Sequence, residues 1–206
     1  MSTPQKPALV FDFGGVLLEW DPRHLYRKLF NEDNAAMERF LLEVDFSNWN
    51  TEQDRGRSFA QAVSELSMRF PHYAELIKAY DERWEESIDG PIQPVVDMLW
   101  VLKEKGYRLY GLTNWSQEKF ELVQHKYPFL KLFEFILVSG SVGLVKPDPR
   151  IFAMLLKKTG YLPQQCIFID DSLKNVAAAQ VLGFIPIHFQ SPSQLLDELS
   201  LHGILL

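Results

Sequence analysis

The chain has 206 residues, enough to bury a sizeable core, either as one domain or as a core with a small accessory domain. Its hydrophobic content of 47% and charged content of 23% are ordinary for a soluble globular protein, and its net charge of −6 argues against a nucleic-acid binder, which would normally show a basic face. A local positive pocket can still form on an acidic protein, so a small anionic ligand is not excluded.

The first predicted element is a buried strand. The apolar run Ala8-Leu9-Val10-Phe11 ends at Asp12 and a Gly-Gly pair, a pattern typical of a strand that enters a tight turn. The region that follows, from about residue 20 to 86, has no convincing strand. It carries long amphipathic patterns at 24–30, 35–44, 59–70 and 73–84. We interpret this region as a helical insertion behind the first strand.

After the turn signal Asp89-Gly90-Pro91 the pattern changes to strands that alternate with helices. Short apolar runs lie at 109–112, 135–138, 166–169 and 184–187, and helical periodicity occurs at 91–105, 117–126, 149–158 and 173–182. Such alternation predicts a parallel sheet covered on both faces. The predicted fold is α/β, with a three-layer Rossmann-like core formed by residues 1–18 and 89–206 and an inserted all-helical cap at residues 19–88.

Polar residues follow four of the five predicted strands. In an open parallel sheet, ligands gather at the carboxyl ends of the strands. The residues at these ends are Asp12, Thr113-Asn114, Ser139 and Asp170-Asp171. This arrangement is the main functional signal in the sequence.

Each of these residues also has a purely structural interpretation. Asp12 is a candidate nucleophile, with the glycines allowing backbone amides to approach an anion, or else it caps a turn. The adjacent acids Asp170 and Asp171 favour a hard, oxygen-liganded ion such as Mg²⁺, or else one of them caps the next helix. Thr113 and Asn114 suit a phosphate oxygen at a helix N-terminus, where simple capping is the alternative.

Lys146 completes the set of candidates. It lies in Lys146-Pro147-Asp148, after the glycine-bearing loop 139–143, where it could neutralise a nucleophile and a phosphate together. A Lys-Pro pair is otherwise common in surface loops. Taken in order, the four segments around Asp12, Thr113, Lys146 and Asp170-Asp171 resemble the four motifs of the haloacid dehalogenase-like superfamily.

The resemblance covers nearly the whole chain and is sharpest at 10–17, 112–114, 138–152 and 168–183. Residues 138–149 are similar to the subgroup that carries a helical cap after the first motif. The resemblance implies that Asp12 becomes an aspartyl-phosphate, that Thr113 holds a phosphate oxygen, and that Lys146 offsets negative charge around Asp12.

The same resemblance implies a magnesium site. Asp171 matches a ligand of the ion, and Asn175 stands at the second acidic position of that motif. Asp170 is expected to be a ligand or a neighbour of the ligands. Asp12 and the backbone carbonyl of Gly14 complete the protein's share of the metal shell.

Gly14 is also where the sequence departs from the pattern. Phosphatases of this superfamily typically carry there an Asp that protonates the leaving group and then activates water. Three interpretations follow: a cap residue or a water replaces that acid, the protein is a metal-independent dehalogenase-type hydrolase, or it only binds a phosphorylated metabolite. Three carboxylates without a cation would be electrostatically costly, which favours magnesium and a phosphate ester.

The cap is expected to select the substrate, and a first motif with Gly at this position resembles capped sugar-phosphate phosphatases. Arg23 near the expected hinge, and Arg55 in the polar break Asp54-Arg55-Gly56, are candidates to contact a second anionic group or a sugar hydroxyl; a solvated cap surface is the alternative. Trp20 and Trp49 fit packing better than sugar binding.

The remaining expectations concern location and partners. The one cysteine, Cys166, excludes an intrachain disulfide and fits a reducing cytoplasm, and its apolar neighbours predict a buried thiol. No signal peptide is evident, and no segment approaches the roughly 20 apolar residues of a membrane span. We expect a cytoplasmic protein that acts on a small phosphorylated substrate, with no nucleic-acid or membrane partner, as a monomer or homodimer.

Overall fold

A five-stranded sheet lies at the centre of the computed structural model, which describes residues 6–206. Its strands are β1 (Ala8–Phe11), β4 (Arg108–Thr113), β5 (Phe135–Val138), β6 (Cys166–Asp170) and β7 (Ile185–His188). They lie in the order β5-β4-β1-β6-β7, and every neighbouring pair is parallel. This confirms the predicted parallel sheet and places β1 in its middle.

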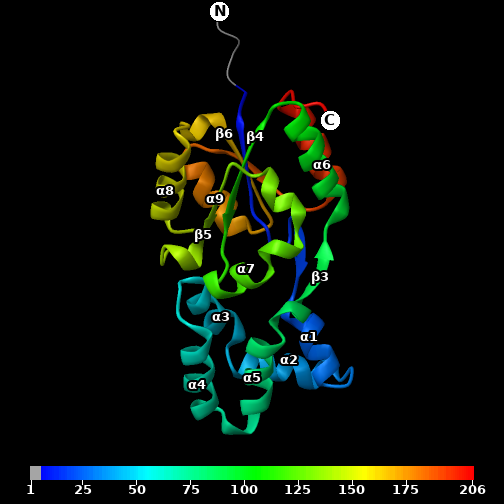
Figure 1. Ribbon diagram of the computed structural model, residues 1–206, viewed down its shortest axis with the longest axis vertical. Coiled ribbons are helices and arrows are strands. Elements are labelled where there is room, and N and C mark those ends of the chain that lie inside the picture. The colour runs from blue at the N-terminus through cyan, green and yellow to red at the C-terminus, as the bar shows by residue number, and fades with distance from the viewer. Residues whose placement is uncertain (1–5) are drawn as a thin grey trace, which may run out of the picture.

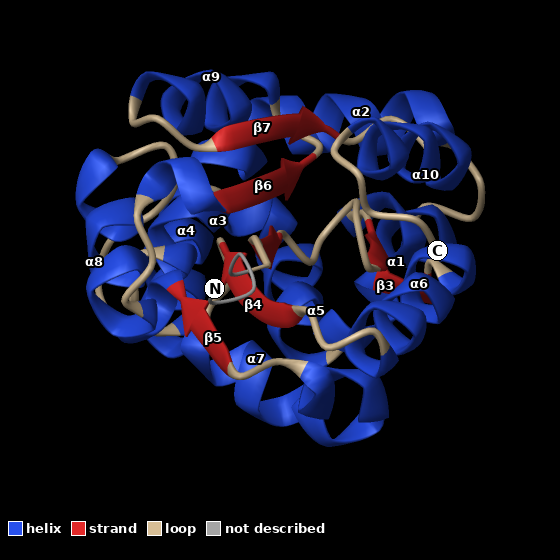
Figure 2. Cartoon of the chain, turned by 90° about the horizontal axis from the view of Figure 1, so that it is seen from above, coloured by secondary structure: helices blue, strands red, loops and turns tan. Residues whose placement is uncertain are grey.

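The two faces of the sheet are covered by different helices, as the alternation of side chains along β1 requires. Ala8 and Val10 point to one face, where they join the apolar side chains of α8 (Pro149–Thr159) and α9 (Leu173–Val181). Leu9 and Phe11 point to the other, toward α6 (Gln93–Glu104) and α10 (Pro192–Leu201). Figures 1 and 2 show α8 and α9 on one side and α6 and α10 on the other. The predicted three-layer core is therefore confirmed.

A group of five helices lies beyond the carboxyl ends of the strands (Figure 1). These are α1 (Pro22–Leu29), α2 (Asn34–Glu43), α3 (Phe46–Asp54), α4 (Phe59–Arg69) and α5 (Ala74–Glu82). Their aromatic side chains pack together; Tyr80 contacts the rings of Tyr26, Phe46, Trp49 and Phe59. Burial of rings of this size is a large part of what stabilises a small helical group.

The remaining elements are short. Helix α7 spans Gln117–Val123, and 3₁₀ turns occur at Pro71–Tyr73, Trp84–Ser87, Gln124–Lys126, Pro128–Leu132, Ser139–Ser141 and Pro163–Gln165. In the part of the chain that the structure describes, no helix is long and apolar enough to cross a membrane. Cys166 is 1% exposed, as predicted.

Two strands and two helices, α3 and α10, were absent from the expected set. β2 (Leu18–Trp20) and β3 (Ile88–Pro91) form an antiparallel pair that connects the sheet to the five helices. Both are very short, and the Gly and Pro that end β3 are typical of a turn, so neither has a clear strand pattern. We propose the boundaries of the helical cap, 18/19 and 88/89, inside this pair.

Helix α3 has few apolar residues in the run FSNWNTEQD. It forms because Phe46 and Trp49 pack into the aromatic cluster of the cap, which also buries Gln53. Tertiary packing therefore overrides a weak local helical signal here.

Candidate active site

Asp12, Lys146 and Asp170 meet at the carboxyl end of the central strands. The backbone N–H of Asp12 donates to Ile169 O at 2.9 Å, which holds the residue directly beyond β1 and beside the end of β6. Lys146 Nζ lies 2.9 Å from Asp12 Oδ1 and 2.7 Å from Asp170 Oδ2. The structure thus brings together three of the residues that the sequence singled out, although they are far apart in the chain.

The ammonium group of Lys146 is completely enclosed. Its side chain is 0% exposed, and Nζ also donates to Leu112 O at 2.7 Å, so that three acceptors surround its three hydrogens. Burial opposes the charge, but Asp12 and Asp170 outweigh it and raise the pKa of Lys146. A permanent positive charge is therefore built in beside Asp12.

Asn114 fixes the backbone of this lysine. Its Oδ1 accepts from Lys146 N at 2.8 Å, and its Nδ2 donates to Lys146 O at 3.0 Å. The amide was expected to contact substrate, but both of its polar atoms serve Lys146 here. The structure therefore favours a positioning role for Asn114.

Asp170 is surrounded by donors. Besides Lys146 Nζ, it accepts from Ser172 N at 2.9 Å and from Asn175 Nδ2 at 3.0 and 3.1 Å. Asn175, which matches an acidic position of the motif, thus orients Asp170 in this structure. Because both oxygens of Asp170 already have partners, Asp171 is the freer of the two acids.

The carboxylates of Asp12, Asp170 and Asp171 form a group that could hold a cation. One oxygen of each lies within 4.8 Å of the others. Burial raises the pKa of Asp12 to about 7, against the opposing effect of Lys146, and burial together with Asp170 raises the pKa of Asp171. Three carboxylates share the site with one ammonium group, so they hold more negative charge than Lys146 offsets, which a hard divalent cation would relieve.

The Gly-Gly pair has two separate roles. Gly15 has φ +73°, and a Cβ there would lie 2.4 Å from Asp171 Oδ2, so only glycine lets Asp171 approach. Gly14 has no such constraint: a Cβ there would meet Trp20 Cβ at an ordinary 3.9 Å. A side chain would fit at position 14, so lack of space does not explain why this residue is glycine.

Thr113 ends β4 and is 1% exposed. In the parallel register Phe11 pairs with Gly111, so Thr113, two residues after Gly111, lies just beyond the end of β1. The hydroxyl is therefore carried at the same edge of the sheet as Asp12. Its expected contact with a phosphate oxygen stays a prediction.

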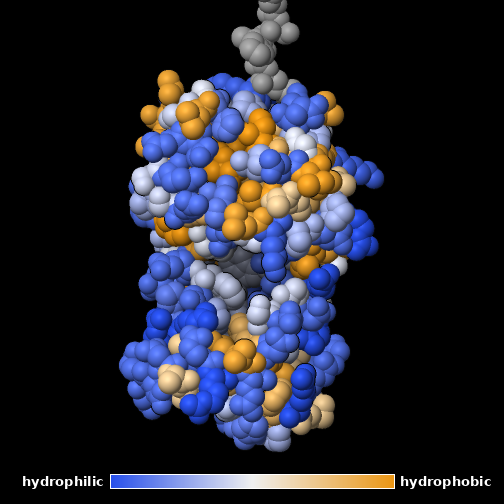
Figure 3. Space-filling view, turned by 180° about the vertical axis from the view of Figure 1, so that it is seen from behind, coloured by the Kyte–Doolittle hydropathy of each residue, from blue (hydrophilic) through white to orange (hydrophobic). Residues whose placement is uncertain are grey.

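A cavity lies between this edge and the helical cap. Its lining is Gly14, Leu18, Trp20, Asn50, Asp54, Phe59, Trp84, Asn114, Trp115 and Ser116. Figure 3 shows the molecule hollowed between its upper and lower parts. Gly14 and Asn114 line this cavity, and Asn114 contacts the backbone of Lys146, so the cavity adjoins the group formed by Asp12, Lys146 and Asp170.

The two arginines expected to contact substrate do not line this cavity. Arg23 pairs with Glu38 and Asp21, and it borders a neighbouring groove that shares Trp20, Asn50 and Asp54 with the cavity. Arg55 pairs with Glu52 at 3.3 Å, with 42% of its side chain exposed. Substrate binding by either arginine stays a prediction.

Sequence reasoning missed two residues near the site. His188 ends β7, and its Nε2 lies 3.0 Å from Asp171 O; it was a polar residue after the fifth strand and could have been included on that signal. Asp54 lines the cavity from the end of α3. Burial raises the pKa of Asp54 to about 7, although the backbone N–H of Ser116 and the charge of Lys146 lower it.

This pKa predicts a pH-dependent stability. The folded state binds the Asp54 proton more tightly than the unfolded state, so the contribution of Asp54 to stability falls as pH rises from about 4 to about 7 and is then constant. Asp54→Asn removes the free-energy cost of ionising this carboxyl group in the folded protein, although Lys146 and the Tyr80 hydroxyl still face position 54. We expect the variant to be more stable than wild type by on the order of 2 kcal/mol at pH 8 and by less at pH 5, measured by urea unfolding. Equal differences at both pH values would contradict the assignment.

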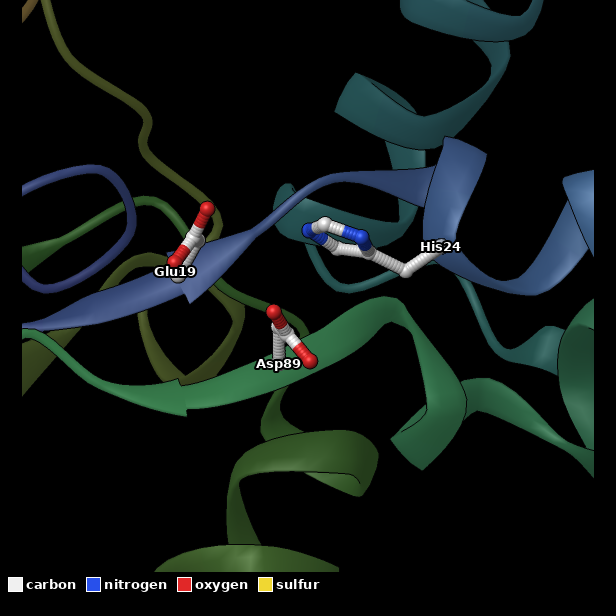
Figure 4. Close-up of side chains that lie close together, drawn as sticks. All are labelled: Glu19, His24 and Asp89. Carbon is white, nitrogen blue, oxygen red and sulfur yellow. The ribbon is translucent and has the colours of Figure 1, made fainter.

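A second group of possible metal ligands lies at the connecting strands. Figure 4 shows Glu19 on β2, Asp89 on β3 and His24 on α1 turned toward one another, with ligand atoms within 4.8 Å. Both carboxylates are exposed and His24 is half-buried. Exposed carboxylates are well solvated without an ion, so we give this group no part in the chemistry.

Comparison with known proteins agrees with this geometry. The family model described as haloacid dehalogenase-like hydrolase matches residues 6–183. A sesquiterpene phosphatase of Aspergillus oryzae is 26% identical over 189 residues, which cover 88% of each chain. A drimenol cyclase of Aspergillus calidoustus is 27% identical over 196 residues, but these are 94% of this chain and only 36% of the cyclase. A HAD family enzyme from Bacteroides thetaiotaomicron, solved with magnesium and inorganic phosphate, is 24% identical, with a TM-score of 0.68 over 91% of this chain and 96% of that one. At this identity the structure shows a shared fold.

Proposed function

The chain belongs to the haloacid dehalogenase-like hydrolases, and we propose that it hydrolyses a small phosphate monoester with Mg²⁺, through an aspartyl-phosphate on Asp12. The observation that carries the proposal is the enclosed Lys146, which lies between Asp12 and Asp170 at the same edge of the sheet as Asp171. A nucleophilic carboxylate must approach an anionic substrate, and this arrangement supplies the compensating charge.

The carboxylate group fits a magnesium ion. Asp12, Asp171 and, less directly, Asp170 offer the oxygen ligands that this ion prefers, and we place the carbonyl of Gly14 with them. When bound, Mg²⁺ would neutralise charge on the transferring phosphoryl oxygens. The excess of three carboxylates over one ammonium group supports this assignment, because a divalent cation would balance their negative charge.

The protein's own residues then perform the transfer. Lys146 and the Phe13 backbone N–H both contact Asp12 Oδ1, and the structure gives Oδ2 no partner among residues 6–206, so Oδ2 is free to attack phosphorus. Lys146 lowers the repulsion between this carboxylate and the phosphate. The Thr113 hydroxyl would donate to a phosphoryl oxygen, and Asn114 holds Lys146 in place. Water then hydrolyses the aspartyl-phosphate.

The cavity narrows the choice of leaving group. Four aromatic side chains line it, those of Trp20, Phe59, Trp84 and Trp115, and none of its ten lining residues is Lys or Arg. Aromatic walls suit a sugar ring or an apolar group, and they offer nothing to a second phosphate. We propose a monophosphate with a small ring-shaped or apolar leaving group. A sugar phosphate is the first candidate, and the sesquiterpene phosphatase makes a prenyl phosphate the second.

Magnesium removal tests the proposal. Phosphate release from 4-nitrophenyl phosphate, a hexose phosphate and a prenyl phosphate should fall at least about 100-fold with a chelator and return with added Mg²⁺. Activity that survives the chelator would contradict a magnesium site, and halide release from a halo-acid without metal would favour the dehalogenase chemistry. Thermal stabilisation by a phosphate ester without any turnover would indicate a binding protein.

A further inference from the structure

An alkyl or sugar leaving group needs a proton as its bond to phosphorus breaks, and Gly14 offers none. Resting on the phosphatase function above, we propose that Asp54 of the helical cap donates this proton to the leaving-group oxygen and then takes one from the attacking water. Asp54 comes from α3, on the opposite wall of the cavity from the sheet.

The end of α3 is docked firmly on the core. Ser139 Oγ donates to Asp54 O at 2.6 Å and accepts from Trp115 N at 2.9 Å, which connects the cap to the loops behind β4 and β5. Gly56 and Gly140 make this approach possible: a Cβ on Gly56 would lie 2.9 Å from Gly140 O, and one on Gly140 would lie 2.5 Å from Gln117 N. Asp54 is therefore placed by the backbone and not by a mobile loop.

A chain of hydrogen bonds orients its carboxyl group. Trp84 Nε1 donates to Tyr80 Oη at 3.1 Å, Tyr80 Oη donates to Asn50 Oδ1 at 3.0 Å, and Asn50 Nδ2 donates to Asp54 Oδ2 at 3.3 Å. Burial raises the pKa of Tyr80 well above its usual value, so its hydroxyl keeps the proton that it donates to Asn50. Asn50 therefore orients the carboxyl group of Asp54 through Oδ2, and the backbone N–H of Ser116 faces the same group from the core side of the cavity.

The other polar groups of the cavity are unsuited to proton transfer. Asn50 and Asn114 carry amides, and the hydroxyl of Ser116 caps α7 through Lys119 N. Asp54 is the only one of the ten lining residues with a group that titrates near neutral pH. Its pKa of about 7 means that a substantial fraction holds a proton at neutral pH, as a general acid requires.

The two steps balance. In the first, an oxygen of Asp12 bonds to phosphorus, the bond from phosphorus to the leaving oxygen breaks, and the Asp54 proton goes to that oxygen, which gives an alcohol and an Asp54 carboxylate. In the second, water adds to phosphorus and gives one proton to Asp54, while the bond to Asp12 breaks. Inorganic phosphate, the Asp12 carboxylate and protonated Asp54 result.

Asp54→Asn tests this role through the leaving group. The ratio kcat/KM covers the steps up to loss of the leaving group, and 4-nitrophenolate leaves without a proton. We expect kcat/KM for 4-nitrophenyl phosphate to change by less than about 3-fold, and that for phenyl phosphate or a hexose phosphate to fall about 10²–10⁴-fold. Glu52→Gln, on the exposed side of the same helix, is the matched control and should behave as wild type.

A second variant separates chemistry from folding. Position 14 has room for a side chain on the same cavity. We therefore expect kcat/KM for phenyl phosphate to be at least about 10-fold higher when Gly14→Asp is combined with Asp54→Asn than in Asp54→Asn alone. An equal loss on both aryl substrates, or no loss, would overturn the role of Asp54. A wild-type protein without magnesium-dependent phosphatase activity would instead overturn the function on which it rests.

Discussion

Asp12→Asn is expected to lower kcat at least about 10³-fold on every phosphate ester, whatever its leaving group. The amide has almost the shape of the carboxylate but lacks its charge and nucleophilicity. The contact from Phe13 N to Oδ1 can persist in the variant, so its fold should be retained. This insensitivity to the leaving group distinguishes loss of the nucleophile from loss of the proton donor.

Rapid acid quenching gives a direct measurement. Wild-type protein quenched during turnover should carry one added phosphoryl group by mass, and Asp12→Asn should carry none. The exposed Asp97, which Gln93 Nε2 contacts on α6, supplies the control: Asp97→Asn should retain both the activity and the adduct. Turnover above a tenth of the wild-type value in the Asp12 variant would show that another group attacks phosphorus.

Much of the site could be predicted because the ends of parallel strands can be located in the sequence and lie together at one edge of the folded sheet. Asp12, Thr113 and Asp170 each end a buried apolar run, and parallel strands carry such residues to one edge of the sheet. Lys146 is different. It lies eight residues beyond β5 in a loop without regular structure, so only its resemblance to a family motif indicated it, and local chemistry alone favoured a surface loop.

The contribution of the cap could not be predicted in the same way. The turn at 54–56 was recognised as a polar break, but local composition does not show which of its side chains points inward. Arg55 was favoured, whereas Asp54 lines the cavity. That outcome depends on Ser139 and Gly140, which lie more than 80 residues away and meet α3 only after the cap has packed on the core.

Lys146→Met is expected to lower both activity and stability. The substitution keeps most of the volume but leaves Asp12 and Asp170 without their shared cation. Breaking a buried ion pair in this way typically costs about 3–5 kcal/mol, and losing charge stabilisation beside a transferring phosphoryl group typically lowers kcat about 10²–10³-fold. Because Mg²⁺ would compensate part of the same charge, its stabilising effect on the variant should exceed its effect on wild type.

Lys119 provides the matched control, because it is also a buried lysine in an ion pair. Its side chain is 8% exposed and contacts Asp81 of α5. Lys119→Met should lose stability in urea unfolding but keep a wild-type response to Mg²⁺ and nearly wild-type kcat. If Mg²⁺ stabilised the two variants equally, Lys146 would have only a structural role and the carboxylates around it would not interact with the metal ion. A larger response in Lys146→Met alone would show that lysine and metal act on one electrostatic site.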